Sequence, residues 1–193
     1  MNVVTLTLGE YQTNCYLISD DCGKTAVIDP GYEPETVLAK TRELQLSIGA
    51  ILLTHGHFDH VGAVRPLAEA IRCPVWLHKN ELRLPPFLTA GKLYYTNTYA
   101  EGDTVSVGGL TFMVIETPGH TSGSVCLRCG ETLFSGDTLF AGSCGRVDLG
   151  GSRSDMRQSL ARLAAIPENL TVLPGHGPAT TLDREREFCP WFI

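Results

Sequence analysis

Four side chains that can bind a metal ion fall within residues 54–60 of the sequence. They are His55, His57, Asp59 and His60. Neutral imidazole nitrogen and carboxylate oxygen are the ligands that Zn²⁺ and similar borderline cations prefer. His55 and His57 are two residues apart in an extended loop, so they can point toward one ion. Asp59 and His60 follow a turn at a helix start and can reach a second ion.

Three further candidates each follow a turn that contains glycine. His120 and His176 follow Pro-Gly pairs, and Asp137 follows a glycine. Each turn comes after an apolar run that is typical of a strand, so it would deliver one polar side chain to the edge of a sheet, where active sites commonly form. The sixth histidine, His78, stands outside this pattern and is interpreted as an ordinary structural residue.

The elements that must position these side chains are strands at both ends of the chain with helices between them. Runs of β-branched and apolar residues between turn formers predict the strands, and amphipathic spacing predicts the helices. The segment 84–100 contains two prolines, a glycine and little periodicity, and is predicted to be irregular. We therefore expect an α/β (α+β) fold of two packed sheets with helices outside. The predicted strands are 3–8, 14–18, 25–29, 48–54, 75–77, 104–107, 110–116, 124–128, 132–135 and 170–173; the predicted helices are 34–46, 61–71 and 154–166, with a partly helical tail over 183–193.

Composition narrows the class of protein. A chain of 193 residues without a linker or repeat predicts a single domain, 1–193. The net charge of -6 argues against a nucleic-acid partner and a polybasic membrane anchor. The sequence contains no run of about 18 apolar residues, so no membrane span is expected. The seven cysteines are irregularly spaced, which favours a reduced, cytoplasmic protein. The Cys126 and Cys129 pair lies in a predicted strand, so the two thiols should face opposite sides.

The motifs, taken in order, resemble those of the metallo-β-lactamase superfamily. The motifs are His-x-His-x-Asp-His, Pro-Gly-His-Thr-x-Gly, Gly-Asp and Gly-His-Gly, and together they span nearly the whole chain. The resemblance implies a four-layer αβ/βα sandwich of two mixed sheets with the site at one edge, and Asp29 as a residue that orients the ligand loop. The implied ligands are His55, His57 and His120 for one divalent ion, Asp59, His60 and His176 for a second, and Asp137 as the bridge between them.

Within the superfamily, residues 136–152 resemble the short glyoxalase II-like (hydroxyacylglutathione hydrolase-like) group. This resemblance implies a hydrolase of S-lactoylglutathione or a related small-molecule thioester. A hydroxide bridging two ions would attack the carbonyl, with zinc as the first expectation and iron or manganese as the others, while Asp59 orients the hydroxide or transfers a proton. The C-terminal helical domain that binds glutathione in longer relatives is not expected here.

Several assignments beyond the metal ligands follow from position in the sequence. Thr121 is close enough to His120 to fix its ring, and Arg146, Cys144 and Tyr94 are candidates for substrate contacts.

Other functions also remain open. A persulfide dioxygenase of the same fold would use one iron held by two histidines and an aspartate. A lactonase or β-lactamase-like hydrolase and a non-enzymatic metal-binding domain are the lesser alternatives.

Overall fold

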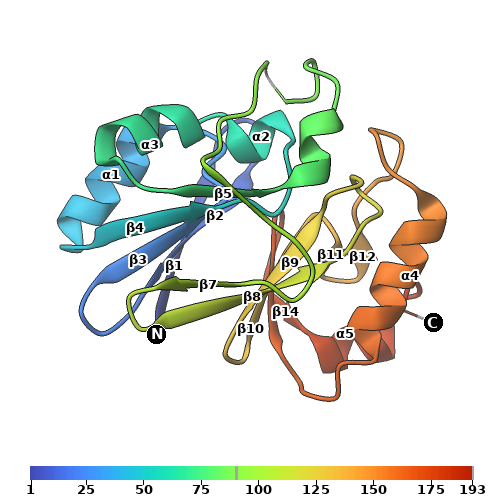
Figure 1. The fold of residues 1–193 in the computed structure, drawn as a ribbon. Coiled ribbons are helices and arrows are strands. Elements are labelled where there is room, and N and C mark those ends of the chain that lie inside the picture. Colours follow the sequence, from blue (N-terminus) through green and yellow to red (C-terminus); the bar gives the residue numbers. More distant parts are fainter. Residues whose placement is uncertain (90, 193) are drawn as a thin grey trace.

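The computed structural model describes residues 1–89 and 91–192. In this part of the chain, two six-stranded mixed sheets pack face to face, and helices cover the outer face of each (Figure 1). This is the four-layer sandwich that the sequence motifs imply, so the predicted fold class is confirmed. No helix of the described residues is long and apolar enough to cross a bilayer.

The first sheet comes from the amino-terminal half. Its three amino-terminal strands are antiparallel, and the next three add in parallel. The parallel strands place their carboxyl ends at the same edge of the sheet, where the first ligand loop begins. In order, the strands are β1 (Asn2–Leu8), β2 (Thr13–Ser19), β3 (Lys24–Ile28), β4 (Ser47–Leu52), β5 (Val75–His78) and β6 (Asn97–Tyr99).

The second sheet comes from the carboxyl-terminal half. It is antiparallel except where β10 pairs with β13. In spatial order its strands are β14 (Thr180–Thr181), β13 (Thr171–Pro174), β10 (Thr132–Gly136), β9 (Val125–Cys129), β8 (Leu110–Glu116) and β7 (Thr104–Val107). A small hairpin of β11 (Leu139–Phe140) and β12 (Ser143–Cys144) leaves it after β10.

Three apolar clusters form the layers because side chains alternate along each strand. In β2, Leu17 faces the helices of the first sheet, whereas Ile18 faces the second sheet. In β9, Cys126 packs under the carboxyl-terminal helices and Cys129 packs between the sheets, as the C-x-x-C spacing in a strand predicts. The helices on the first sheet are α1 (Pro34–Glu43), α2 (Phe58–Val61) and α3 (Val64–Ile71). The helices on the second sheet are α4 (Arg153–Ala164) and α5 (Leu182–Phe188), and the short 3₁₀ helix η1 (Lys79–Arg83) follows β5.

The elements differ from the prediction in several places, and the short elements η1 and β14 were not predicted. The helix predicted over 61–71 begins only at Val64, as α3, and its first residue, Val61, ends the separate helix α2. Between the two helices the chain passes close to Gly31, where a Cβ at Gly62 would lie 2.4 Å from the Gly31 carbonyl oxygen. The segment 84–100 contains the short strand β6, which has too few residues to show a period. The hairpin β11–β12 was also missed. At the start of α4 the Ser152 side chain accepts the Asp155 N–H and caps the helix. The tail predicted to be partly helical contains α5, and of this tail residue 193 lies outside the described residues.

The burial of the cysteines gives the first testable prediction. Cys22 is exposed, whereas Cys126 is buried, and burial raises the pKa of its thiol to about 12. Only the thiolate reacts readily, so an aromatic disulfide reagent at about pH 8 should modify Cys22 in a fast phase. The Cys22→Ser chain should lose that phase. As the control, unfolding in denaturant should make all seven thiols of the wild-type chain reactive, and one fewer in the variant. A fast phase that survives in Cys22→Ser would contradict this burial.

Candidate metal centre

The expected ligands lie in four loops at one edge of the two sheets. The loops follow β4, β8, β10 and β13, and they are joined where they leave the strands. The Val125 N–H donates to the Thr54 carbonyl at 2.9 Å, and the Gly175 N–H donates to the Gly136 carbonyl at 2.8 Å. The strand-turn-ligand pattern of the sequence therefore brings residues more than 100 positions apart into contact, as in the His60–His176 pair.

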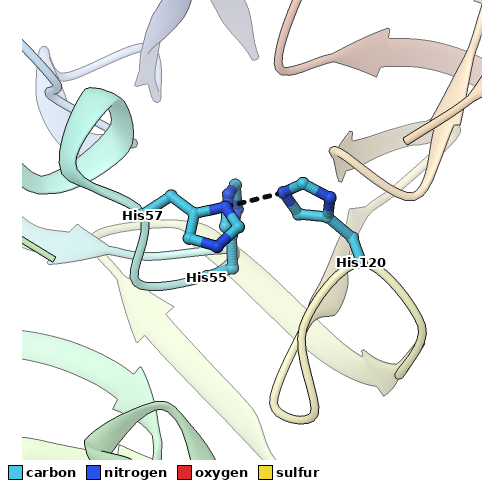
Figure 2. A group of neighbouring side chains, drawn as sticks. All are labelled: His55, His57 and His120. Carbon is cyan, nitrogen blue, oxygen red and sulfur yellow. Dashed lines mark hydrogen bonds between the residues drawn. The ribbon is translucent and has the colours of Figure 1, made fainter. Parts of the chain in front are cut away.

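Three histidines form the first group. His55 and His57 come from the loop after β4, and His120 comes from the loop after β8; Figure 2 shows the three rings converging. One ligand nitrogen from each lies within 4.8 Å of the others. His57 Nδ1 is 2.8 Å from His120 Nε2, a contact between two ring nitrogens that requires a proton or a cation between them.

The second group consists of Asp59, His60 and His176. Asp59 and His60 lie on α2, and His176 follows β13. His176 Nε2 is 3.2 Å from Asp59 Oδ2 and 3.3 Å from His60 Nε2. Imidazole and carboxylate in this combination are suitable ligands for zinc, iron or manganese.

Asp137 lies between the two groups. Its Oδ1 is 3.4 Å from His60 Nε2 in the second group, and its Oδ2 is 3.5 Å from His120 Nε2 in the first. The Oδ2 is also 3.6 Å from His176 Nε2. A single carboxylate thus faces ligands of both groups, which is the position that a bridging ligand requires.

Two buried polar atoms among the described residues have no hydrogen-bond partner. They are His55 Nε2 and Asp137 Oδ1. Leaving a buried polar atom unsatisfied costs about 1–3 kcal/mol. One of these atoms belongs to the first ligand group and the other to the carboxylate between the two groups. The residues present therefore fit divalent metal ions, which would satisfy both atoms.

The ring nitrogens that face away from the centre all lie next to an oxygen atom. Such partners fix the tautomer of a ligating histidine and orient its ring. Most of the partners are backbone carbonyls. The pairs are His120 Nδ1 with Arg146 O at 2.7 Å, His57 Nε2 with Leu149 O at 3.2 Å, His176 Nδ1 with Tyr11 O at 3.0 Å, His60 Nδ1 with Asp29 Oδ2 at 3.0 Å, and His55 Nδ1 with Thr54 Oγ1 at 3.1 Å.

The electrostatics of the two groups differ. Burial lowers the pKa of His55 well below its usual value and that of His57 to about 4, so these rings are neutral near pH 7. Burial also opposes the charge of His60, but the carboxylates of Asp137 and Asp29 outweigh it and raise its pKa well above the usual value. Because histidine binds metal in its neutral form, the first group is already in the ligating state.

Two glycines allow the close approach of the loops. A Cβ at Gly175 would lie 2.2 Å from Asp137 Oδ1 and 2.7 Å from His60 Cε1, so a side chain there would displace both ligands. At Gly56, a Cβ would lie 3.1 Å from Glu81 Oε2, so a side chain there would crowd the bend between His55 and His57. The glycines of the motifs therefore serve the packing of the ligand loops.

A cavity of about 350 Å³ opens over both groups. Its walls are largely apolar, and one cationic side chain, Arg146, lies at the rim. Arg146 makes a bidentate ion pair with Asp148, with contacts of 2.7 and 2.6 Å, and both side chains are more than 60% exposed. The lining residues apart from the ligands and Arg146 are Tyr11, Phe58, Leu88, Phe140 and Leu149.

Three expected contacts are not made. Tyr94 lies outside the cavity because its ring packs under the Arg65 guanidinium, 5.1 Å from the ring centroid, and against the core beneath α3. Cys144 also lies outside, since β12 turns its side chain toward the core under α4. The Thr121 hydroxyl does not bond to the His120 ring but donates to Glu81 at 2.7 Å.

His78 and Asp29 lie where the sequence placed them. His78 is buried outside the ligand groups, with Nε2 2.9 Å from Glu116. Asp29 is buried next to the ligand loop and accepts hydrogen bonds from the backbone and hydroxyl of Thr54. The sequence interpretation missed Glu81 and the apolar walls, because nothing in the local pattern distinguishes such residues from ordinary core or loop residues.

Comparisons with known proteins show the family to which the chain belongs. The model of the metallo-β-lactamase superfamily matches residues 8–176, so the chain belongs to that superfamily, whose members are usually hydrolases. Hydroxyacylglutathione hydrolase GloC of Haemophilus influenzae is 31% identical over 99% of this chain and 98% of its own length. A probable polyketide biosynthesis zinc-dependent hydrolase, BaeB of Bacillus velezensis, is 36% identical over 84% of this chain and 72% of its own.

Solved structures give the same result. The crystal structure of BLEG-1, a B3 metallo-β-lactamase, superimposes with a TM-score of 0.92 at 34% identity and covers 99% of both chains. The structure of TTHA1623 in a di-iron-bound form has a TM-score of 0.87 at 41% identity, over 98% of this chain and all of that one (100%). The first neighbour shares its fold with this chain, and the second carries two metal ions in such a fold.

Proposed function

We propose that the protein is a dinuclear metal-dependent hydrolase that cleaves a small-molecule thioester. The observation that carries the proposal is the position of Asp137 between a group of three histidines and a group of two histidines and an aspartate, beneath an open cavity. His55, His57 and His120 would hold one ion, Asp59, His60 and His176 the other, and Asp137 both. Divalent ions in such a site would supply Lewis acidity and lower the pKa of water toward about 7.

The side chains of the centre would then manage substrate and proton. Asp59 lines the cavity, and its Oδ2 is held by the Thr13 hydroxyl at 3.3 Å, so its carboxylate is oriented to accept a proton from the attacking water. The apolar walls around Phe58 and Phe140 would bind the acyl group and exclude bulk water.

The cavity favours a thioester over an amide. A thiolate leaves easily because its conjugate acid has a pKa of about 8.5, whereas an amine must be protonated as it leaves. Apart from the ligand residues, the titratable side chains lining the cavity are Tyr11 and Arg146. Neither is a typical general acid near neutral pH. A proton for an amine leaving group would therefore have to come from Asp59, once it has taken it from the water. A thiolate leaves without that proton, so a thioester makes the smaller demand on the site. The similarity to GloC supports the same class.

The zinc-loaded protein should be tested on a panel of thioesters. S-lactoylglutathione and a neutral thioester are the main substrates, and thiol release is the readout. An oxygen electrode with glutathione persulfide and iron-loaded protein tests the alternative of a persulfide dioxygenase, which would use one iron. Thiol release that depends on metal supports the proposal. Oxygen uptake without thioester hydrolysis, or bound metal with no turnover of any thioester, would overturn it.

The Arg146–Asp148 pair gives a prediction about substrate charge. Arg146 holds the pKa of the Asp148 carboxyl at about 2, so the pair is ionised in any ordinary assay. Asp148→Asn would release the guanidinium to bind a carboxylate on the substrate. We expect KM for the anionic S-lactoylglutathione to fall several-fold, while KM for a neutral thioester stays the same.

Arg146→Ala is the matched variant and should raise KM for the anionic substrate alone. Because His120 bonds to the backbone carbonyl of Arg146 and not to its side chain, this change should leave the metal content unaltered. Equal effects on the neutral and the anionic thioester would show that the guanidinium does not contact the substrate.

A further inference from the structure

Glu81 is a carboxylate with no exposed surface, and it lies outside the ligand motifs. It lies in η1, directly after β5, and is 0% exposed. Glutamate is almost never fully buried unless it is paired or hydrogen-bonded. Its partners therefore indicate what it does.

All three partners belong to the loops that carry the first ligand group. Glu81 Oε2 accepts the Gly56 N–H at 2.6 Å, and Oε1 accepts the Thr121 hydroxyl at 2.7 Å and the Gly123 N–H at 2.8 Å. Gly56 lies between His55 and His57 in the sequence, and Thr121 directly follows His120. One carboxylate thus joins the loop from the first sheet to the loop from the second, beside all three histidines.

The second ligand group is held by other partners. Asp59 accepts from the Thr13 hydroxyl at 3.3 Å, His60 lies 3.0 Å from Asp29, and His176 lies 3.0 Å from the Tyr11 carbonyl. Thus Glu81 contacts residues adjacent to His55, His57 and His120, and the second group depends on a separate set of contacts.

We infer that Glu81 is a positioning residue that sets the spacing of the loops carrying His55, His57 and His120. It thereby tunes the affinity of one of the two metal positions and not the other. The inference rests on the proposed dinuclear centre and assigns a function to a residue outside the ligand motifs.

Glu81→Gln is the substitution that tests this role with the least change in shape. Glutamine has one acceptor oxygen and one NH₂ donor in place of two acceptor oxygens. Its NH₂ must face either the Gly56 N–H or the Gly123 N–H and Thr121 hydroxyl, so one loop loses its bond. The direct bond from the Val125 N–H to the Thr54 carbonyl, at 2.9 Å, remains and keeps the loops attached at their base.

The two metal positions can be measured separately in full-length chains. His176→Ala removes a ligand of the second group and leaves the first to be titrated with zinc, and His120→Ala does the reverse. Adding Glu81→Gln should weaken zinc binding about tenfold or more in the His176→Ala chain. The same addition should leave zinc binding unchanged in the His120→Ala chain.

Glu185→Gln is the matched control. Glu185 is also a 0% exposed carboxylate, and it accepts a backbone N–H from Gly142 at 2.7 Å and the Thr180 hydroxyl at 2.5 Å, away from both ligand groups. The Glu185→Gln variant should lower the melting temperature about as much as Glu81→Gln does, but it should leave the zinc affinity unchanged. Thr121→Val, which removes one of the three partners, should weaken the first position less than Glu81→Gln does.

Two results would overturn the inference. Equal weakening of zinc binding in both backgrounds would mean that Glu81 supports the fold in general, and no weakening in the His176→Ala chain would mean that it does not position the histidines. A wild-type chain that takes up no zinc would reject the proposed metal centre itself, and with it this inference, before any variant is compared.

Discussion

Replacing Asp137 by asparagine is expected to reduce bound zinc from two ions per chain to one or fewer and to abolish hydrolysis. The carboxylate lies 3.4 Å from His60 Nε2 and 3.5 Å from His120 Nε2, so it faces both ligand groups. Asparagine keeps the shape but removes the negative charge and turns one oxygen into an NH₂ donor. Loss of a mere supporting partner costs about 10–100-fold, so loss of this ligand should lower kcat/KM by about 100-fold or more.

Zinc per chain after gel filtration and the rate of thiol release are the two measurements. Asp103→Asn is the control, because it removes the same charge from an exposed turn whose carboxylate accepts the Ala100 N–H at 2.8 Å. That variant should keep its metal and its rate. If Asp137→Asn retained both zinc ions and most of its activity, Asp137 would not be the bridge.

The sequence predicts the layers and the ligand loops well, for a physical reason. A largely buried strand such as β4 or β10 has an apolar signal, and a polar side chain in the turn that follows must emerge at the strand's end. Because the strands belong to two packed sheets, the ends meet at one edge. Residues as distant as His55 and His120 are thereby brought together, although no local pattern links them.

The contacts around the ligands are much harder to predict. His120, His57 and His176 bond to the backbone carbonyls of Arg146, Leu149 and Tyr11. Every residue type has a carbonyl, so the sequence gives no sign of which one a ring will meet. For Tyr94 the sequence suggested a contact that the position of the ring does not allow. Its type suggested a substrate contact, but the path of the irregular segment places the ring under Arg65.

Asp29 is the exception among these supporting partners, since a motif pointed to it. It is buried at the end of β3 with a positive φ of 50°, a conformation that aspartate and asparagine adopt more readily than most residues. Its Oδ1 accepts the Thr54 N–H at 2.8 Å, and its Oδ2 accepts the Thr54 hydroxyl at 2.5 Å and lies 3.0 Å from His60 Nδ1. The carboxylate therefore fixes both the start of the ligand loop and one ligand ring.

Asp29→Asn should weaken zinc binding at the second group by about 10–100-fold. Asparagine keeps the backbone conformation and an oxygen for the Thr54 N–H, but it turns an NH₂ donor toward His60 Nδ1. That nitrogen must then accept, which moves the ring proton to Nε2, the atom that faces Asp137 and His176. The wrong tautomer thus blocks the ligand position without removing any ligand.

Zinc titration of the His120→Ala chain, with and without Asp29→Asn, measures this effect at the second group alone. Asp20→Asn is the matched control. Asp20 follows β2 at the edge of the sheet away from the ligand loops, and its carboxylate accepts three backbone N–H groups, from Cys22, Lys24 and Gly109. Loss of that carboxylate should destabilise the turn and leave zinc affinity intact. Unchanged affinity in Asp29→Asn would mean that the His60 ring keeps its ligating tautomer without the carboxylate, and the orientation of the ring would then have to come from its packing on α2.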